Sequence, residues 1–231
     1  MHQLQPGLGV IFDMDGVLVD SADLHFEAWK RLGEDIKVPF PHDVFEQTFG
    51  MHNREIIPLW LSHRALTAER IELLAEQKEV MYREVAKGFL RPIDGAVNLV
   101  TSLADAGFVL ALGSSGPRAN VELVLDLLGV RSRFAALVTG DEVRHGKPHP
   151  EVFMKAAEML DLPPIRCLVI EDAPQGVQAG LDAGAHVAAV CTSRQASELK
   201  DAHLVIESLN ELNPTIVRRI LEHHIQHSPV K

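Results

Sequence analysis

Short runs of mostly apolar residues recur along the chain and predict buried β-strands. Each run is four to six residues long and lacks the strict apolar–polar alternation of a strand with one face in solvent. Such runs are typical of parallel strands that are covered on both faces. They span residues 8–12, 108–112, 135–138, 167–170, 185–190 and 203–206.

Helical patterns separate these runs. In the segment 119–128, apolar residues recur at Val121, Val124, Leu125 and Leu128, and Gly129 follows as a helix stop. Similar patterns occupy residues 97–104, 150–160, 174–183 and 208–223. Strands that alternate with helices of this length predict an α/β fold, with a doubly wound parallel sheet built from right-handed βαβ units.

One long stretch breaks the alternation. Residues 21–88 contain no convincing strand and instead show four helical segments, at 22–32, 43–49, 54–62 and 67–87. A stretch of this length is too long for a loop. We therefore expect an inserted four-helix cap domain at 21–88 and a core domain made of 1–20 and 89–231. The cap should lie over the carboxyl end of the first strand, where open α/β sheets bind their ligands.

Two carboxylates follow the first predicted strand directly. Asp13 and Asp15 come after an apolar run, and Gly16 follows them. Buried carboxylates are costly unless they are used, and a glycine lets backbone N–H groups approach an anion closely. The alternative interpretation is a pair of turn residues that lead into a helix cap near Ser21.

Three more polar clusters follow the next predicted strands. Ser114 and Ser115 follow the second strand, Lys147 follows the third, and Glu171 and Asp172 follow the fourth. Taken singly, the serines can be helix caps and the lysine an exposed loop residue. Together the clusters would meet at one edge of the sheet, which indicates a site for an anionic substrate and a cation.

Composition narrows the possible partners. The 22 Lys+Arg against 32 Asp+Glu give a formal net charge of −10, which opposes nucleic-acid binding through phosphate contacts. The excess of carboxylates leaves ligands for a hard cation such as Mg²⁺. Two cysteines make no disulfide framework, and no stretch approaches the roughly 18 apolar residues of a membrane span. We expect a cytoplasmic monomer with neither a nucleic-acid nor a membrane partner.

The four clusters carry a family resemblance. The stretch 12–21, FDMDGVLVDS, resembles the signature of the haloacid dehalogenase-like superfamily, and the other three clusters fall where its remaining motifs belong. The helical insert resembles the four-helix cap of the subgroup that holds phosphoglycolate phosphatases, sugar-phosphate phosphatases and β-phosphoglucomutases. The resemblance covers residues 8 to about 206.

The resemblance implies catalytic and metal-binding roles. Asp13 would be the nucleophile that forms an aspartyl-phosphate, and Asp15 would be the general acid and base. Mg²⁺ would be held by the Asp13 and Asp172 side chains and the Asp15 backbone carbonyl, with Glu171 close by.

The resemblance also implies the phosphate contacts. Ser114, Ser115 and Lys147 would bind phosphate oxygens, and Gly16 would offer its backbone. The Lys147 ammonium would offset the charge of Asp13. The family often has a cis peptide here, which we expect at Lys147–Pro148.

Selectivity for the substrate should arise in the cap. His25 and Trp29 are four residues apart and share a helix face, although packing between cap and core would also explain them. Gly50 marks a turn that leads to Arg54, and Lys78 lies on the long fourth helix. The substrate-binding residues of β-phosphoglucomutases resemble the set His25, Trp29, Arg54 and Lys78. For Arg54 and Lys78, the alternative is a solvated helix face. Such residues also occur in capped sugar-phosphate phosphatases.

Two departures from the mutase pattern favour a phosphatase. The turn at Gly50 is one residue longer than the usual mutase turn, and the loop 114–120 replaces a mutase-like Ser-Ala-Ser-Lys. That loop places Arg118 and Asn120 at the expected substrate rim. We predict a Mg²⁺-dependent phosphohydrolase that acts on a small phosphorylated metabolite, most simply a sugar phosphate. The alternatives are a β-phosphoglucomutase and a non-catalytic sugar-phosphate binding protein.

Overall fold

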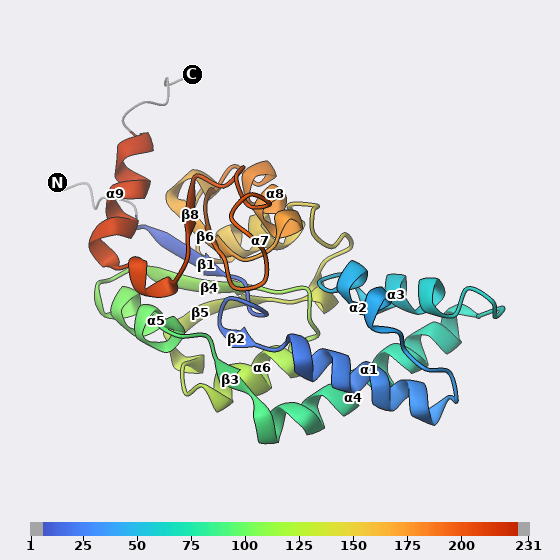
Figure 1. Ribbon diagram of the computed structural model, residues 1–231. Helices are drawn as coiled ribbons and strands as arrows, with labels where there is room; N and C mark the ends of the chain where they lie inside the picture. Colours follow the sequence, from blue (N-terminus) through green and yellow to red (C-terminus); the bar gives the residue numbers. More distant parts are fainter. Residues whose placement is uncertain (1–6, 226–231) are drawn as a thin grey trace.

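Six parallel strands form the central sheet of the computed structural model, which describes residues 7–225 (Figure 1). Their order is β5-β4-β1-β6-β7-β8, so β1 lies in the interior between β4 and β6. This confirms the predicted doubly wound α/β fold. The strands span Gly9–Phe12 (β1), Val109–Gly113 (β4), Phe134–Val138 (β5), Cys167–Glu171 (β6), His186–Val190 (β7) and Leu204–Ile206 (β8).

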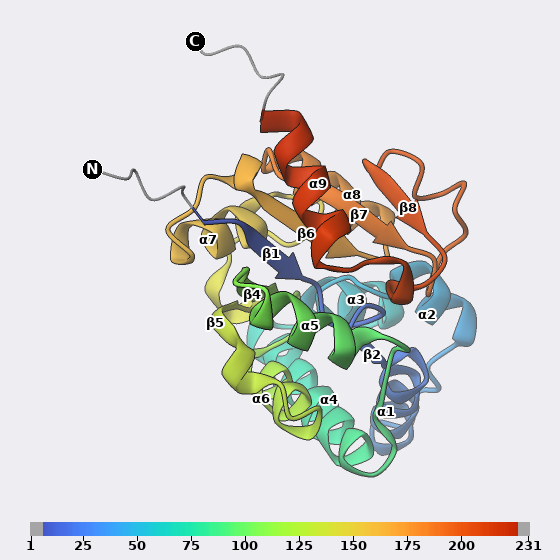
Figure 2. The same ribbon diagram turned by 90° about the vertical axis from the view of Figure 1, so that its left-hand side faces the viewer.

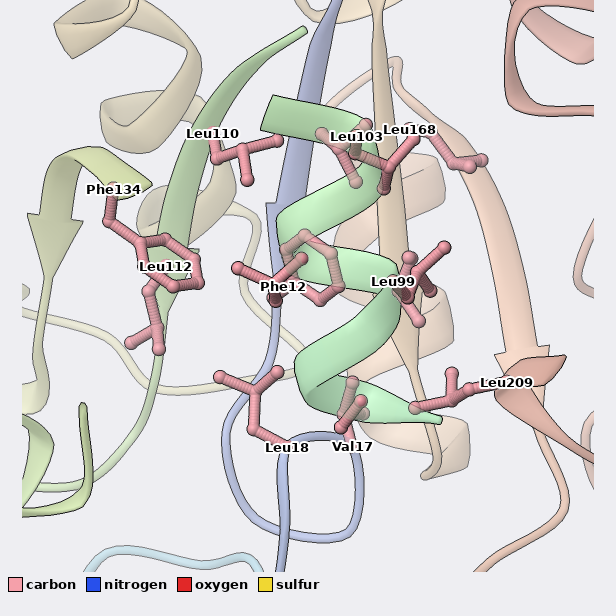
Figure 3. Close-up of a cluster of buried hydrophobic side chains, with 14 of the residues drawn as sticks. Phe12, Val17, Leu18, Leu99, Leu103, Leu110, Leu112, Phe134, Leu168 and Leu209 are labelled. Atoms are coloured by element: carbon pink, nitrogen blue, oxygen red, sulfur yellow. The ribbon is translucent and has the colours of Figure 1, made fainter. Parts of the chain in front are cut away.

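Helices cover both faces of the sheet. Successive side chains of β1 point to opposite faces, so Phe12 packs in one apolar cluster and Ile11 in another. Figure 3 shows Phe12 surrounded by Leu99 of a covering helix and by leucines of neighbouring strands. The helices of the Phe12 face are α5 (Ala96–Asp105), α6 (Arg118–Leu127) and α9 (Pro214–Ile225); those of the Ile11 face are α7 (Glu151–Met159) and α8 (Pro174–Asp182).

The prediction of one helix over 208–223 is wrong for the first third of that range. A 3-10 turn at Leu209–Glu211 comes first, and α9 begins only at Pro214. The Asn213 side chain accepts hydrogen bonds from the backbone N–H groups of Thr215 and Ile216, both at 3.0 Å. Asn213 therefore caps the helix start, and Pro214 lacks the N–H group that a continuous helix would need there. Other 3-10 turns lie at Arg131–Arg133, Gly140–Glu142 and Pro164–Arg166.

Four helices lie between β1 and α5 in the chain and beside the carboxyl ends of the strands (Figures 1 and 2). They have an apolar cluster of their own, in which Trp29 stacks on Phe40 with ring centroids 4.8 Å apart and Phe40 meets Trp60 edge-on at 5.0 Å. These helices are α1 (Ala22–Asp35), α2 (His42–Thr48), α3 (Asn53–Trp60) and α4 (Ala68–Phe89).

Two segments connect this helical unit to the sheet, and they form a β-ladder with each other. Residues Val19–Asp20 (β2) and Arg91–Pro92 (β3) form a short antiparallel ladder that the apolar pattern did not reveal. Two residues are too few to show a hydrophobic period. The ladder ties the outgoing and returning segments together.

Two helical glycines provide a test of packing between helix and sheet. A Cβ on Gly180 of α8 would lie 2.8 Å from Val187 Cγ2, whereas a Cβ on Gly88 of α4 would meet nothing within 4 Å. We expect Gly180→Ala to lower the free energy of unfolding by about 1–3 kcal/mol through overpacking. Gly88→Ala should raise it by up to about 1 kcal/mol, because alanine favours the helix. Urea unfolding measures both, and equal stability of the two variants would contradict this packing.

Candidate active site

Residues that follow β1, β4, β5 and β6 meet at one cavity between the sheet and the helical unit. Its volume is about 390 Å³, within the range typical of small-molecule sites. Asp13, Asp15, Lys147, Glu171 and Asp172 line it from the core. The parallel strands bring these residues together because their carboxyl ends share one sheet edge.

Asp13 lies beside the ammonium of Lys147. Lys147 Nζ donates to Asp13 Oδ1 and, at 2.6 Å, to Glu171 Oε1. Burial raises the pKa of Asp13 to about 7; the Lys147 charge opposes this rise, and the charges of Glu171 and Asp15 add to it. Burial would lower the pKa of Lys147, but the two carboxylates outweigh it and hold the pKa above its usual value. Lys147 is therefore a permanent cation at the cavity floor.

Three buried carboxylates form a set that fits a hard cation. Oxygen atoms of Asp13, Glu171 and Asp172 all lie within 4.8 Å of one another. Burial raises the pKa of Asp172 well above its usual value, and the charges of Glu171 and Asp13 raise it further. A divalent cation would relieve this repulsion, and an all-oxygen donor set suits Mg²⁺.

Two glycines let these carboxylates come close to the backbone. A Cβ on Gly16 would lie 1.9 Å from Asp172 Oδ2, and a Cβ on Gly176 would lie 1.7 Å from Glu171 Oε1. Glu171 Oε2 also accepts backbone N–H bonds from Asp172 at 2.9 Å and Ala173 at 3.1 Å. Glu171 is thus held by two backbone N–H groups and Lys147, whereas Asp13 is held by Lys147 and Asp172 by the Ser193 side chain.

Two residues at the start of α1 contact the Asp15 carboxylate. Ser21 Oγ donates to Asp15 Oδ1 at 2.5 Å, and His25 Nε2 of α1 lies 3.3 Å from the same oxygen. Burial alone would raise the pKa of Asp15, but the hydrogen bonds and charge of His25 and the Ser21 bond lower it overall. The helical unit therefore contacts a catalytic candidate of the core directly.

A buried polar chain continues from His25 into α4. His25 Nδ1 lies 2.6 Å from Lys78 Nζ, and Lys78 donates to Glu79 Oε1 at 2.9 Å. Glu79 Oε2 accepts from the amide of Asn120 on α6 at 2.5 Å, and Arg83 donates to the Asn120 oxygen at 3.0 Å. Asn120 is thus a core residue whose side chain is held from α4.

The predicted phosphate ligands separate into two groups. Ser115 and Lys147 line the cavity. The Ser114 side chain is buried and accepts a hydrogen bond from the Gly116 N–H at 3.0 Å. Gly16 has a φ of +80° and donates its N–H to the Val19 carbonyl at 2.8 Å. Neither Ser114 nor Gly16 is part of the cavity lining, so their phosphate contacts stay predictions.

The predicted substrate residues also separate. His25, Trp29, Gly50, Arg54 and Lys78 line the cavity. Trp29 also packs in the apolar cluster of the helical unit, the alternative that its helix position suggested.

Two rim candidates lie outside the lining. Arg118 forms an ion pair with Glu142 at 2.7 Å, and Asn120 is occupied by Glu79 and Arg83. Because neither residue lines the cavity, their predicted substrate contacts are not supported by the structure.

The sequence patterns missed Glu79, the acceptor at the centre of the polar chain. A signal existed: Leu74, Lys78 and Tyr82 are spaced four residues apart, so the lysine falls on the buried stripe of its helix. A buried lysine demands a buried acid nearby, and Glu79 is the adjacent residue. His52 and Asn53, which also line the cavity, gave no comparable signal.

Comparison with known proteins agrees with this geometry. The sequence matches the haloacid dehalogenase-like hydrolases over residues 8–184. The chain belongs to the haloacid dehalogenase-like hydrolase family. The expected cis peptide at Lys147–Pro148 is also confirmed.

Relatives in this family include mutases and phosphatases. β-Phosphoglucomutase of Bacillus subtilis is 34% identical over 211 residues, covering 88% of this chain and 90% of that protein. Hexitol phosphatase A of Escherichia coli is 30% identical over 214 residues, covering 90% and 94%. The crystal structure of β-phosphoglucomutase from Clostridium difficile superposes with a TM-score of 0.85 at 25% identity, covering 96% of this chain and 100% of that one.

Removing the Glu79 charge should destabilise the protein in a pH-dependent way. Burial opposes ionisation, but Lys78, His25 and the hydrogen bonds of Lys78 and Asn53 lower the pKa of Glu79 from 4.5 to about 2. The ionised form therefore contributes stability above pH 4.5, and this contribution is lost as pH falls toward 2. We expect Glu79→Gln to cost about 1–3 kcal/mol at pH 7 and progressively less below pH 4.5.

Urea unfolding of the wild type and Glu79→Gln at several pH values measures this difference. Glu84→Gln, an exposed change on the same helix, is the control and should stay within about 0.5 kcal/mol of the wild type. A cost of Glu79→Gln that is the same at pH 7 and pH 3.5 would show that ionisation is not involved.

Proposed function

We propose that this protein is a Mg²⁺-dependent phosphatase that acts on a small phosphorylated metabolite, a sugar phosphate, through an aspartyl-phosphate on Asp13. The supporting observation is the placement of Asp13 at the cavity floor, between the Lys147 ammonium and the Asp172 carboxylate. A nucleophilic carboxylate needs no base, but it must approach a phosphate of like charge.

Lys147 reduces that repulsion. It hydrogen-bonds Asp13 and stays charged, so it lowers the negative potential that an incoming phosphate meets. When bound by Asp13 and Asp172, Mg²⁺ would supply further positive charge for the phosphoryl oxygens. Attack by an Asp13 oxygen on phosphorus breaks the ester bond, and the leaving oxygen takes a proton.

Asp15 is proposed as the source of that proton. It lines the same cavity two residues after Asp13, and Ser21 and His25 fix its carboxylate. A bound phosphate adds negative charge beside Asp15, which favours its protonated form in the first step. In the second step Asp15 would accept a proton from the water that attacks the aspartyl-phosphate, and this step releases inorganic phosphate.

A second candidate function is β-phosphoglucomutase. It is supported by the 34% identity to the Bacillus subtilis enzyme of that name. In a mutase, a sugar hydroxyl rather than water would take the phosphoryl group from Asp13. Conversion of β-glucose 1-phosphate to glucose 6-phosphate without phosphate release would favour this candidate.

The domain roles and partners proposed for the enzyme follow from the cavity lining and the net charge. We propose that 21–88 acts as a cap over a core of 1–20 and 89–231, because the lining residues come from both parts. The net charge of −10 supports a small-molecule partner rather than nucleic acid, and a cytoplasmic monomer remains our proposal. Among the helices that the structure describes, none combines the length and apolar composition that a bilayer crossing needs.

Phosphate release from p-nitrophenyl phosphate tests the proposed chemistry. We expect activity with Mg²⁺, loss of activity with EDTA, and recovery when excess Mg²⁺ is restored. Asp13→Asn removes the nucleophile and should lower kcat at least about a thousandfold. Asp15→Asn should lower it about a hundredfold or more, because it removes the proton donor.

Asp23→Asn is the matched control, since Asp23 is exposed on α1 and outside the cavity lining. Its activity should equal that of the wild type. Full turnover by Asp13→Asn would exclude the aspartyl-phosphate, and a wild type that is inactive with and without Mg²⁺ would favour the non-catalytic binding protein.

A further inference from the structure

Arg54 at the cavity rim is already paired with a carboxylate. Its Nε lies 2.6 Å from Glu72 Oε1, and its NH2 group donates to Glu72 Oε2 at 3.0 Å. This is a two-point fork between a guanidinium and a carboxylate, the geometry that would otherwise hold a phosphate. Both residues line the cavity, so the pair faces the substrate as a neutral unit.

We use the name cap wall for the cavity-lining residues between 21 and 88. Lys78, the other lysine or arginine of the cap wall, is paired as well. Its ammonium donates to Glu79 at 2.9 Å and lies 2.6 Å from His25 Nδ1. Its side chain is 2% exposed. A lysine enclosed in this way has no free direction in which to bind a second phosphate.

Further carboxylates line the cavity away from the Asp13 cluster. Glu76 accepts one hydrogen bond from Arg83 at 3.2 Å and is mostly exposed, and Asp141 accepts the Arg118 backbone N–H at 2.8 Å. On the cap side of the lining, the three carboxylates of Glu72, Glu76 and Glu79 outnumber the two cations of Arg54 and Lys78, which gives 2 − 3 = −1. Asp141 adds a further negative charge from the core side. Burial lowers the pKa of His52, so the neutral imidazole is favoured there.

We propose that the substrate carries one phosphate and an uncharged, hydroxyl-rich remainder, and that the cap wall rejects a second phosphate. This inference rests on the phosphotransfer function proposed above. Carboxylates accept hydrogen bonds from hydroxyl groups, whereas a second phosphate would meet net negative charge with no unpaired cation among the described lining residues. The apolar side chains of Phe49, Met51 and Ile56 offer contact for the C–H surface of a sugar or polyol.

The same wall bears on the choice between phosphatase and mutase. Transfer of the phosphoryl group from Asp13 to a hydroxyl of a sugar monophosphate produces a sugar bisphosphate. The cap wall disfavours that species and tolerates the dephosphorylated, neutral sugar. Water is therefore the acceptor that fits this cavity.

A panel of paired substrates tests the inference. The pairs are glucose 1-phosphate with glucose 1,6-bisphosphate, fructose 1-phosphate and 6-phosphate with fructose 1,6-bisphosphate, and ribulose 5-phosphate with ribulose 1,5-bisphosphate. For each sugar whose phosphates are hydrolysed, we expect kcat/KM for phosphate release to be at least about tenfold higher for the better monophosphate than for the bisphosphate.

The outcomes separate the two proposals. Equal or faster hydrolysis of the bisphosphates would overturn the inference and leave the phosphatase intact. Hydrolysis of p-nitrophenyl phosphate but of no sugar phosphate would overturn it too. Failure with p-nitrophenyl phosphate as well, at saturating Mg²⁺, would overturn the proposed function itself.

Glu72→Gln tests the role of the Arg54 pair. The change frees the guanidinium, so the ratio of bisphosphate to monophosphate kcat/KM should rise about tenfold. Glu84→Gln removes an equal charge from an exposed position on the same helix, outside the cavity, and should leave the ratio unchanged. An unchanged ratio in Glu72→Gln, or an equal rise in both variants, would show that the Arg54–Glu72 pair does not set this preference.

Discussion

Two buried carboxylates share one ammonium at the floor of the cavity. The arrangement of the surrounding residues follows from this excess of negative over positive charge. Lys147 hydrogen-bonds both Asp13 and Glu171, while Asp172 adds a third carboxylate within the same small volume. Burying several like charges is costly unless cations or hydrogen bonds compensate. The protein meets part of this cost through the backbone N–H groups that hold Glu171 and leaves the remainder uncompensated. An uncompensated negative site would attract a divalent cation, and under the proposed function the cation would in turn make the site attractive to a phosphate.

The sheet makes this concentration of charge possible. β1 lies between β4 and β6, so the residue that follows Phe12 is flanked by the ends of both neighbours. The strands are anchored by apolar clusters on both faces, which supply the stability that the polar edge does not. Glycine at positions 16 and 176 is the local condition, because a side chain at either position would overlap a carboxylate.

The core fold was predictable because its signals are local and repeated. Buried strands leave apolar runs, and the polar residues after them are displayed at a known sheet edge. The pairings of polar side chains between packed helices were not predictable in the same way. Arg54 and Asn120 read equally well as substrate ligands, yet their partners, Glu72 and Glu79, lie 18 and 41 residues away in the chain. Which charge pairs with which depends on how α3, α4 and α6 pack against one another, and neither periodicity nor capping carries that information.

The polar chain from the helical unit to the core connects the proposed substrate-binding residues to the proposed proton donor. Asp15 receives His25 only when α1 is in place, and His25 is held through Lys78 and Glu79. Glu79 also lines the cavity and binds Asn120 of the core helix α6. The Glu79 carboxylate in the cavity lining thus belongs to the same chain of hydrogen bonds as the proposed acid. Displacement of α1 and α4 from the sheet would break the Glu79–Asn120 contact and would also withdraw His25 from Asp15. The proposed proton donor would then lose the partner that fixes its geometry. Under the proposed mechanism the arrangement therefore favours the reaction when the helical unit is in place and the cavity shields Asp13 from bulk water.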